Sequence, residues 1–145
     1  MPTVLTVTDT LTSVMYTSIA TAHGGRTGHV TSADGVIDLD LGKPGSSANP
    51  KANPETLFAS GYAACFQGAL ANRAKTQDID TSDSTVTAAV SLGQIEGGVA
   101  LSVELRVEIP GVDRDKAQEL VELAHQFCPY SRATRGNIEV TLTVV

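Results

Sequence analysis

The 145-residue chain is poor in several features that mark specialised proteins. Lys and Arg total 10 against 16 Asp and Glu, for a net charge of −6, so no basic stripe exists and nucleic acid is not expected as a partner. No apolar run is long enough to span a bilayer, so we expect no membrane association. The first residues lack a basic segment followed by an apolar run, so no signal peptide is expected. We therefore expect a cytoplasmic protein.

Cysteine is equally scarce, because the chain holds only Cys65 and Cys128. The two lie too far apart for a CxxC redox turn or a local metal knuckle, so any partnership between them must be made by the fold. Three interpretations remain open: two inert core thiols, a structural staple, or an attacking thiol with its resolving partner. In a reducing cytoplasm a disulfide is more often transient and catalytic than structural.

The composition, with 41% apolar and 18% charged residues, predicts one globular domain over residues 1–145. Alternation and turn residues predict β-structure in six places. The expected strands cover residues 15–22, 29–32, 36–41, 85–95, 99–109 and 137–145. The Asp34-Gly35 step predicts a hairpin between the second and third of these, and the two longest strands read as an antiparallel hairpin.

Two helices are expected between these strands. The first has Asn53 as its N-cap and Pro54 at its first position, and it is apolar almost all round over residues 57–70, which is typical of a buried helix. Gly61 and Gly68 cost helix stability and therefore indicate a close backbone approach.

The second helix is amphipathic. Asp113 caps it, Pro129 ends it, and its apolar residues follow helical spacing: Ala117, Leu120, Val121, Ala124 and Cys128. We therefore predict an α+β fold, with antiparallel sheets packed around a long central buried helix and a second amphipathic helix.

Neither cysteine has an activating position of its own. Cys128 would lie at the C-terminal end of its helix, where the negative end of the dipole disfavours a thiolate. Cys65 would lie mid-helix among apolar residues, and burial raises the pKa of a thiol. A fixed cation is needed, and arginine suits because it stays protonated when desolvated. Cys65 is then the better nucleophile and Cys128 the better resolving thiol.

Three segments carry a resemblance to a known family. They are residues 53–66 (NPETLFASGYAACF), residues 128–137 (CPYSRATRGN) and residues 22–26 (AHGGR). In order and spacing they closely resemble the organic hydroperoxide resistance proteins of the OsmC-like superfamily. The resemblance implies a thiol-dependent peroxidase, with no bound cofactor, that reduces organic or fatty acid hydroperoxides to alcohols and is reset by a dithiol, usually a lipoyl group or a lipoylated protein.

The resemblance also assigns roles to single residues. Cys65 matches the attacking cysteine and Cys128 the resolving one, so a sulfenic acid on Cys65 would condense to a Cys65–Cys128 disulfide. Arg26 matches the arginine that stabilises the thiolate. Glu55 matches the acid that holds that arginine.

The spacing of these residues on the first helix predicts a second copy of the chain. Glu55 and Cys65 lie roughly 15 Å apart along one helix axis, so an arginine that bridges them within one chain would be badly stretched. Antiparallel pairing of the helix with its own copy would bring Glu55 of one chain toward Cys65 of the other. We therefore predict an obligate, intertwined two-fold homodimer, in which Arg26 and Glu55 come from the partner and Gly61 and Gly68 serve the helix approach.

Other readings of the chemistry carry less weight. His23, His29 and His125 with two cysteines fit no zinc spacing, so no metal is expected. Ser60, Ser131 and His125 form no nucleophile elbow.

The aromatic residues near the cysteines, Tyr62, Phe66 and Tyr130, could line an apolar pocket for alkyl or fatty acyl peroxides, although core packing explains the first two equally well. The rival class is a non-catalytic, stress-related binding module with an inert or structural cysteine pair.

Overall fold

The computed structural model describes residues 2–3, 5, 7–45 and 48–145. The chain divides into two compact units, Met1–Lys51 and Ala52–Val145. The single domain expected over residues 1–145 stays a prediction. The α+β fold class is confirmed, since two three-stranded sheets are combined with helices.

The first unit is built around a small antiparallel sheet in the order β1-β2-β3. Its elements are β1 (Ala20–His23), the 3-10 helix η1 (Gly25–Thr27), β2 (His29–Ser32) and β3 (Asp38–Asp40). Strand β1 is therefore shorter than the strand predicted over residues 15–22. The predicted Asp34-Gly35 hairpin joins β2 to β3, because the Asp34 carboxylate accepts hydrogen bonds from Ser32 Oγ (2.6 Å) and Val36 N–H (3.0 Å).

Helix α1 (Pro54–Lys75) begins the second unit at the predicted cap. Asn53 Oδ1 accepts a hydrogen bond from the Thr56 N–H at 2.9 Å, and Pro54 occupies the first turn. One face of the helix is buried and carries the large residues; the buried set is Tyr62, Phe66, Ala69, Leu70 and Ala74.

The opposite face of α1 is exposed. Ser60, Ala64, Gly68 and Ala71 recur there at helical spacing and leave a narrow row of small side chains. The single chain thus buries one side of α1, and burial of its other side stays a prediction. An apolar pattern cannot tell burial against the helix's own sheet from burial against something else.

The sheet of the second unit contains β4 (Thr85–Ile95), β5 (Gly98–Glu108) and β6 (Val140–Val144) in the order β4-β5-β6. Strands β4 and β5 form the predicted antiparallel hairpin, with Val90 opposite Val103. Strand β6 pairs with β5 in parallel, with Leu142 opposite Leu105. The sheet is therefore mixed where only antiparallel pairing was expected, because two helices intervene between β5 and β6 and bring the chain back to the same end.

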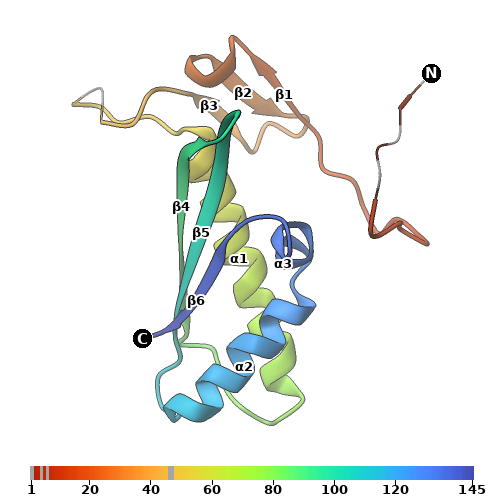
Figure 1. Ribbon diagram of the computed structural model, residues 1–145, viewed down its shortest axis with the longest axis vertical. Helices are drawn as coiled ribbons and strands as arrows, with labels where there is room; N and C mark the ends of the chain where they lie inside the picture. Colours follow the sequence, from red (N-terminus) through yellow and green to blue (C-terminus); the bar gives the residue numbers. More distant parts are fainter. Residues whose placement is uncertain (1, 4, 6, 46–47) are drawn as a thin grey trace. The chain divides into compact units, whose positions relative to one another are not determined.

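Two helices follow β5. Helix α2 (Arg114–Phe127) is capped by Asp113, whose carboxylate accepts from the Lys116 N–H at 3.0 Å, and helix α3 (Pro129–Thr134) follows it directly. As Figure 1 shows, α1 and α2 lie on the same face of the β4–β6 sheet.

The core forms where the helices meet the sheet. Leu120 and Val121 of α2 belong to the same cluster as Leu105 and Val107 of β5, all four are fully buried, and each such side chain contributes about 1.5–3 kcal/mol on burial. This confirms the predicted amphipathic second helix.

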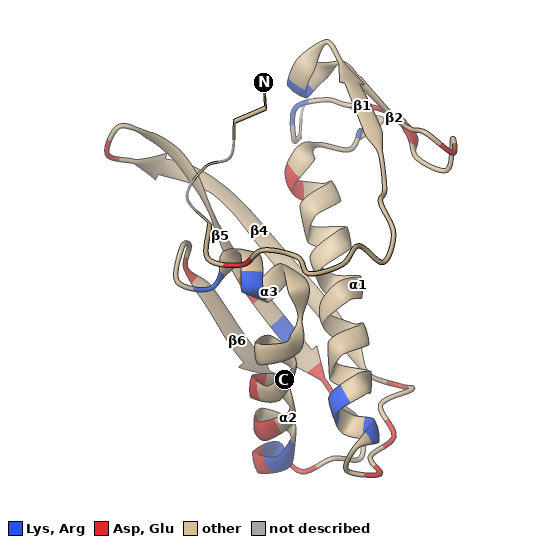
Figure 2. Cartoon of the chain, turned by 90° about the vertical axis from the view of Figure 1, so that its right-hand side faces the viewer, with Lys and Arg blue, Asp and Glu red and all other residues tan. Residues whose placement is uncertain are grey.

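Charge is unevenly distributed over the helices of this unit. In Figure 2 acidic and basic residues gather on α2 and at the C-terminal end of α1, whereas α1 carries no charged residue between Glu55 and Arg73. Arg73 lies over the Phe127 ring at 4.3 Å and links the charged end of α1 to α2. In the described part of the chain, none of the helices has the length and apolarity needed to traverse a bilayer.

Candidate active site

The two cysteines meet between α1 and the α2–α3 junction. Cys128 Sγ lies 3.5 Å from Cys65 Sγ, and both thiols are free. Cys65 is partly exposed on α1, whereas Cys128 is fully buried. Oxidation would require the sulfurs to close to about 2.05 Å, a small movement for two side chains. The fold thus brings together two residues whose partnership the spacing alone left open.

Cys128 lies at a junction between α2 and α3 that was not predicted from the sequence. Its extended backbone ends α2 and at the same time precedes the first residue of α3, and its N–H donates to the Ala124 carbonyl at 2.8 Å. Pro129 ends α2, as predicted, but it also begins α3, because a residue without an N–H suits the first position of a helix. Cys128 therefore lies between two helices and not simply at the end of one.

The environment of Cys65 does not favour a thiolate within this chain. Burial is the largest influence and raises the pKa of the thiol. A hydrogen bond from the Tyr130 backbone N–H acts in the opposite direction, while the neighbouring Cys128 adds to the rise in pKa. This agrees with the expectation that burial disfavours a Cys65 thiolate, while the need for a cation stays a prediction.

Three aromatic rings gather beside the cysteines. Phe58, Tyr62 and Tyr130 contact one another with ring centroids 5.6–6.0 Å apart. Tyr62 and Phe66 are fully buried, so core packing accounts for both, and their expected place in an open substrate pocket finds no support in this structure. Tyr130 is 38% exposed and is the one of the three predicted pocket residues that solvent reaches.

Gly61 makes room for one of these rings. A Cβ at this position would lie 2.7 Å from the Tyr130 hydroxyl, so only glycine allows the ring to lie against α1. A close approach at Gly61 is therefore made by α3 of the same chain, and the predicted role of this glycine in pairing with a second copy stays a prediction. Gly68 has nothing near it and lies on the exposed row of α1, so its role stays a prediction.

A buried cluster of hydroxyl groups lies behind the aromatic rings. Tyr62 Oη is 2.8 Å from Ser131 Oγ and 3.0 Å from Thr134 Oγ1, and all three residues are buried. Sequence reasoning missed this cluster. Its signal was the spacing of Ser131 and Thr134, which places two hydroxyls on one face of a helical turn.

Arg26 and Glu55 belong to different units. Arg26 lies in η1 of the first unit, after Gly24 and Gly25, whose positive φ angles of 81° and 68° favour glycine. Glu55 lies in the first turn of α1, where a carboxylate complements the helix dipole. Their predicted roles stay predictions.

The histidines that raised the zinc alternative have other surroundings. Both ring nitrogens of His29 are hydrogen bonded to carboxylates, Nδ1 to Asp40 at 2.7 Å and Nε2 to Asp38. His125 lies on α2, where burial and Arg135 lower its pKa. Among the residues that the structure describes, no three His, Cys, Asp or Glu side chains are grouped as metal ligands.

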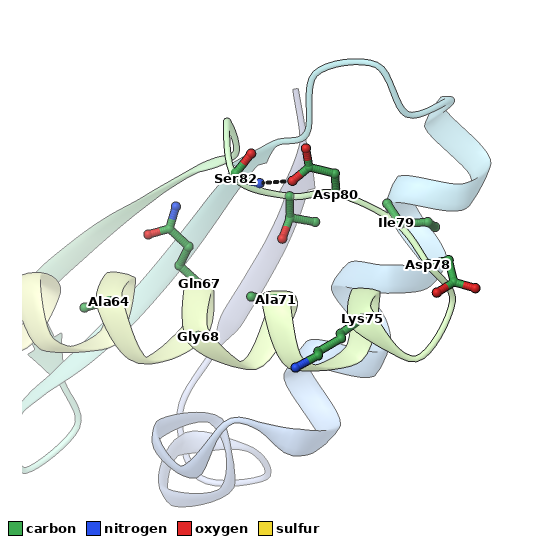
Figure 3. A pocket seen from close by; sticks show the side chains of 10 residues that line it. Ala64, Gln67, Gly68, Ala71, Lys75, Asp78, Ile79, Asp80 and Ser82 are labelled. Carbon is green, nitrogen blue, oxygen red and sulfur yellow. Dashed lines mark hydrogen bonds between the residues drawn. The ribbon is translucent and has the colours of Figure 1, made fainter.

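A large surface hollow, about 870 Å³ in volume, lies on the exposed side of α1 and contains neither cysteine. In Figure 3, Ala64, Gly68 and Ala71 form its floor along α1, and residues 78–82 form its far wall. The small side chains of the exposed row thus leave a depression next to the polypeptide that follows α1.

Comparison with known proteins gives consistent matches over most of the chain. The family model described as OsmC-like protein matches residues 45–143. The organic hydroperoxide resistance protein OhrB of Bacillus subtilis is 51% identical over 132 residues, covering 88% of this chain and 96% of that protein. An organic hydroperoxide resistance protein of Xanthomonas axonopodis pv. citri is 47% identical over 135 residues, covering 90% and 95% respectively.

Solved structures agree with the sequence matches. The crystal structure of Bacillus subtilis OhrB superposes with a TM-score of 0.86 and covers 91% of this chain and 100% of that chain. An organic hydroperoxide resistance protein from Elizabethkingia anophelis, 54% identical, superposes with a TM-score of 0.83 and covers 90% of this chain and 96% of that chain.

Proposed function

The chain belongs to the OsmC-like protein family, among the organic hydroperoxide resistance proteins, and we propose that it reduces organic hydroperoxides to alcohols with the Cys65–Cys128 pair. The observation that carries the proposal is the 3.5 Å contact between two free thiols, one partly exposed and the other buried behind it. A peroxide can approach the first sulfur, and the second is placed to receive the product of that attack.

The reaction proceeds in two steps on these sulfurs. The Cys65 thiolate attacks one oxygen of the O–O bond, so an S–O bond forms, the O–O bond breaks, and the departing alkoxide takes a proton to become the alcohol. Sulfur is oxidised by two electrons to a sulfenic acid. The Cys128 thiol then displaces water from this sulfenic acid and forms the Cys65–Cys128 disulfide, which protects Cys65 from further oxidation.

A dithiol resets the enzyme. One of its thiolates attacks the disulfide to give a mixed disulfide, and its second thiol releases the two protein thiols and leaves the reductant as a cyclic disulfide. A lipoyl group, free as dihydrolipoamide or carried on a protein, has the required pair of thiols and an apolar chain. No bound cofactor is needed. A reducing cytoplasm is the compartment that suits two free thiols.

The cation that Cys65 needs is Arg26, held by Glu55 and supplied by a second copy of the chain. Support comes from burial, which raises the pKa of Cys65, and from the position of Glu55 and Cys65 about ten residues apart on the unbroken helix α1. The exposed row of small residues on α1 suits close packing against a second α1. The assembly is then a two-fold homodimer with composite sites.

The substrate is expected to be apolar. No charged residue lies on α1 between Glu55 and Arg73, and Tyr130, whose side chain is partly exposed, donates its backbone N–H to Cys65. An alkyl or fatty acyl hydroperoxide can lay its chain on this surface, whereas hydrogen peroxide gains nothing from it. Rates measured with cumene hydroperoxide and with hydrogen peroxide should therefore favour the bulky substrate.

The proposal is tested by titrating the reduced protein with cumene hydroperoxide. One equivalent should remove both thiols, release one equivalent of cumyl alcohol and give a Cys65–Cys128 cross-linked peptide in mass spectrometry. The Cys128→Ser variant should stop at the Cys65 sulfenic acid, which dimedone traps. Repeated turnover by the parent protein should require dihydrolipoamide.

The rival is a non-catalytic module with a structural staple. It predicts that freshly purified protein already contains a disulfide that dithiols do not reduce, and that cumene hydroperoxide yields no alcohol. Either result would reject the peroxidase.

A further inference from the structure

Helix α3 is too short to hold its own position. It has six residues, and an isolated helix of that length is unstable in water, so contacts with the rest of the unit must fix it. Its place matters because Cys128 immediately precedes it and Tyr130 belongs to it. Whatever fixes α3 therefore sets where the resolving sulfur and the Tyr130 N–H lie.

The contact that fixes α3 is made by a residue of α1. Tyr62 lies one turn before Cys65 on the same face of α1, and its hydroxyl bonds Ser131 and Thr134 at 2.8 and 3.0 Å. One arrangement of protons satisfies the whole cluster: Thr134 donates to the Ser131 carbonyl (3.3 Å), Tyr62 donates to Thr134, and Ser131 donates to Tyr62. Removing the Tyr62 hydroxyl leaves the buried Ser131 hydroxyl without its partner in the cluster, and removing the Thr134 hydroxyl leaves Tyr62 with one of its two hydrogen bonds.

We propose that Tyr62 is a positioning residue for the resolving step: its hydroxyl holds α3 against α1 so that the Cys128 sulfur and the Tyr130 backbone N–H both stay within reach of Cys65. Tyr62 itself touches no substrate, since it is fully buried. This inference rests on the proposed peroxidase function and assigns to the cluster Tyr62–Ser131–Thr134 the control of how quickly the Cys65 sulfenic acid is resolved.

The consequence concerns the lifetime of the sulfenic acid. When α3 is held, Cys128 lies 3.5 Å from the reacting sulfur and the disulfide forms before a second peroxide arrives. When the cluster is broken, Cys128 spends less time in that position. The sulfenic acid then lives longer and meets more peroxide, which oxidises it irreversibly to the sulfinic acid.

The test compares Tyr62→Phe with the parent protein. The variant keeps the ring and loses only the hydroxyl. Disulfide formation after a single peroxide pulse, followed by quenched-flow mass spectrometry, should slow about fivefold, the factor that corresponds to a neutral hydrogen bond of about 1 kcal/mol. The fraction of sulfinic acid formed per turnover should rise by a similar factor, while the initial consumption of peroxide changes less.

Controls separate positioning from general stability. Tyr16→Phe makes the same chemical change at an exposed position, 82% exposed, and should leave both readouts unchanged. Val107→Ala destabilises the core of β5 away from α3 and should lower the melting temperature without raising sulfinic acid. At position 134, Thr134→Val should reproduce the defect, whereas Thr134→Ser, which keeps a hydroxyl, should behave like the parent.

The outcomes distinguish this inference from the proposed function. If the parent consumes cumene hydroperoxide and Tyr62→Phe forms its disulfide at the parental rate with no excess sulfinic acid, the positioning role is wrong and the peroxidase stands. If Val107→Ala over-oxidises as much as Tyr62→Phe, the effect is one of stability and the inference also fails. A parent that does not consume the peroxide overturns the function itself.

Discussion

The two compact units of the chain differ in how well each covers its own apolar side chains. In the second unit the core continues from α1 and α2 to β5 and β6 and includes fully buried residues such as Phe66 and Leu120. Among the described residues of the first unit only Leu41 is buried, while Leu11, Met15 and Val36 are exposed. The second unit can therefore stabilise itself by burial, whereas the described residues of the first unit bury little apolar surface.

The two units also differ in the functional residues that they contain. The second unit holds both sulfurs and, by burying Cys65, opposes its ionisation. The first unit holds Arg26 on the short 3-10 helix η1. Two glycines with positive φ directly precede Arg26, and a strand follows the helix. If the second unit supplies the nucleophile and the first supplies the charge, then neither should work without the other. Variants in the two units should therefore affect stability and reactivity separately.

The largest effect on activity is expected when the sulfur of Cys65 is replaced. Cys65→Ser should lower turnover of cumene hydroperoxide with dihydrolipoamide by at least about a thousandfold, since it removes the nucleophile. Cys128→Ser should keep the first, single-turnover reduction and lose the disulfide. Coupled turnover assays and mass spectrometry measure both, and equal loss of the first step in the two variants would contradict the division of labour.

Arg26→Ala comes next. Loss of a charged hydrogen-bonding partner should lower activity about ten- to a hundredfold at neutral pH. Mixing this variant with Cys65→Ser and allowing subunits to exchange should restore part of the activity, because one composite site would then contain both intact residues. A mixture that never exceeds the better of the two variants would show that the site is not shared between chains.

Stability measurements should separate the units further. Phe66→Ala should lower the free energy of unfolding by about 3–5 kcal/mol, because it empties a filled core position. Leu11→Ala, at an exposed position, should cost less than about 0.5 kcal/mol when the chain is dilute and more when it is concentrated. Urea titrations at two protein concentrations test this, and an equal, concentration-independent loss for both variants would remove the contrast.

The smallest effect concerns the His29 side chain in the first unit. Hydrogen bonds to Asp40 and Asp38 raise the pKa of His29. Because the folded pKa lies above the unfolded one, the contribution to stability is complete below the unfolded pKa and is lost as pH rises through the folded pKa. Amide exchange in β2 and β3 should therefore speed up as pH passes through that range, beyond the intrinsic pH effect. His29→Gln should abolish the step, and an unchanged step in that variant would assign it to another group.

The sequence predicted the parts of the fold that depend on local chemistry. Asn53, Pro54 and Asp113 mark the starts of α1 and α2 as expected, and alternation located the β4–β5 hairpin. The parallel pairing of β6 was not predictable, since the residues of a strand do not determine which other strand it pairs with. Helix α3 was missed because a stop signal at Pro129 was also a start signal.

The candidate site was predictable in its cysteines but not in its supports. Resemblance to a family paired Cys65 with Cys128, whereas spacing alone could not. The bond from Tyr62 to Ser131 joins residues that are distant in the chain, so only the fold reveals it. The exposed row on α1 was not predictable for the same reason. An apolar pattern indicates that a residue can be buried, but it does not indicate which surface buries it.

The proposed reaction requires Cys65 to be ionised at neutral pH, although its own unit raises its pKa. The rate of Cys65 alkylation by iodoacetamide, followed against pH in the assembled protein with Cys128 replaced by serine, measures this directly. We predict a midpoint below the ordinary cysteine range for the otherwise intact protein, and a midpoint above that range once Arg26→Ala is added. If both proteins titrate alike, above the ordinary range, no cation activates the sulfur and the proposed enzyme does not exist in this form.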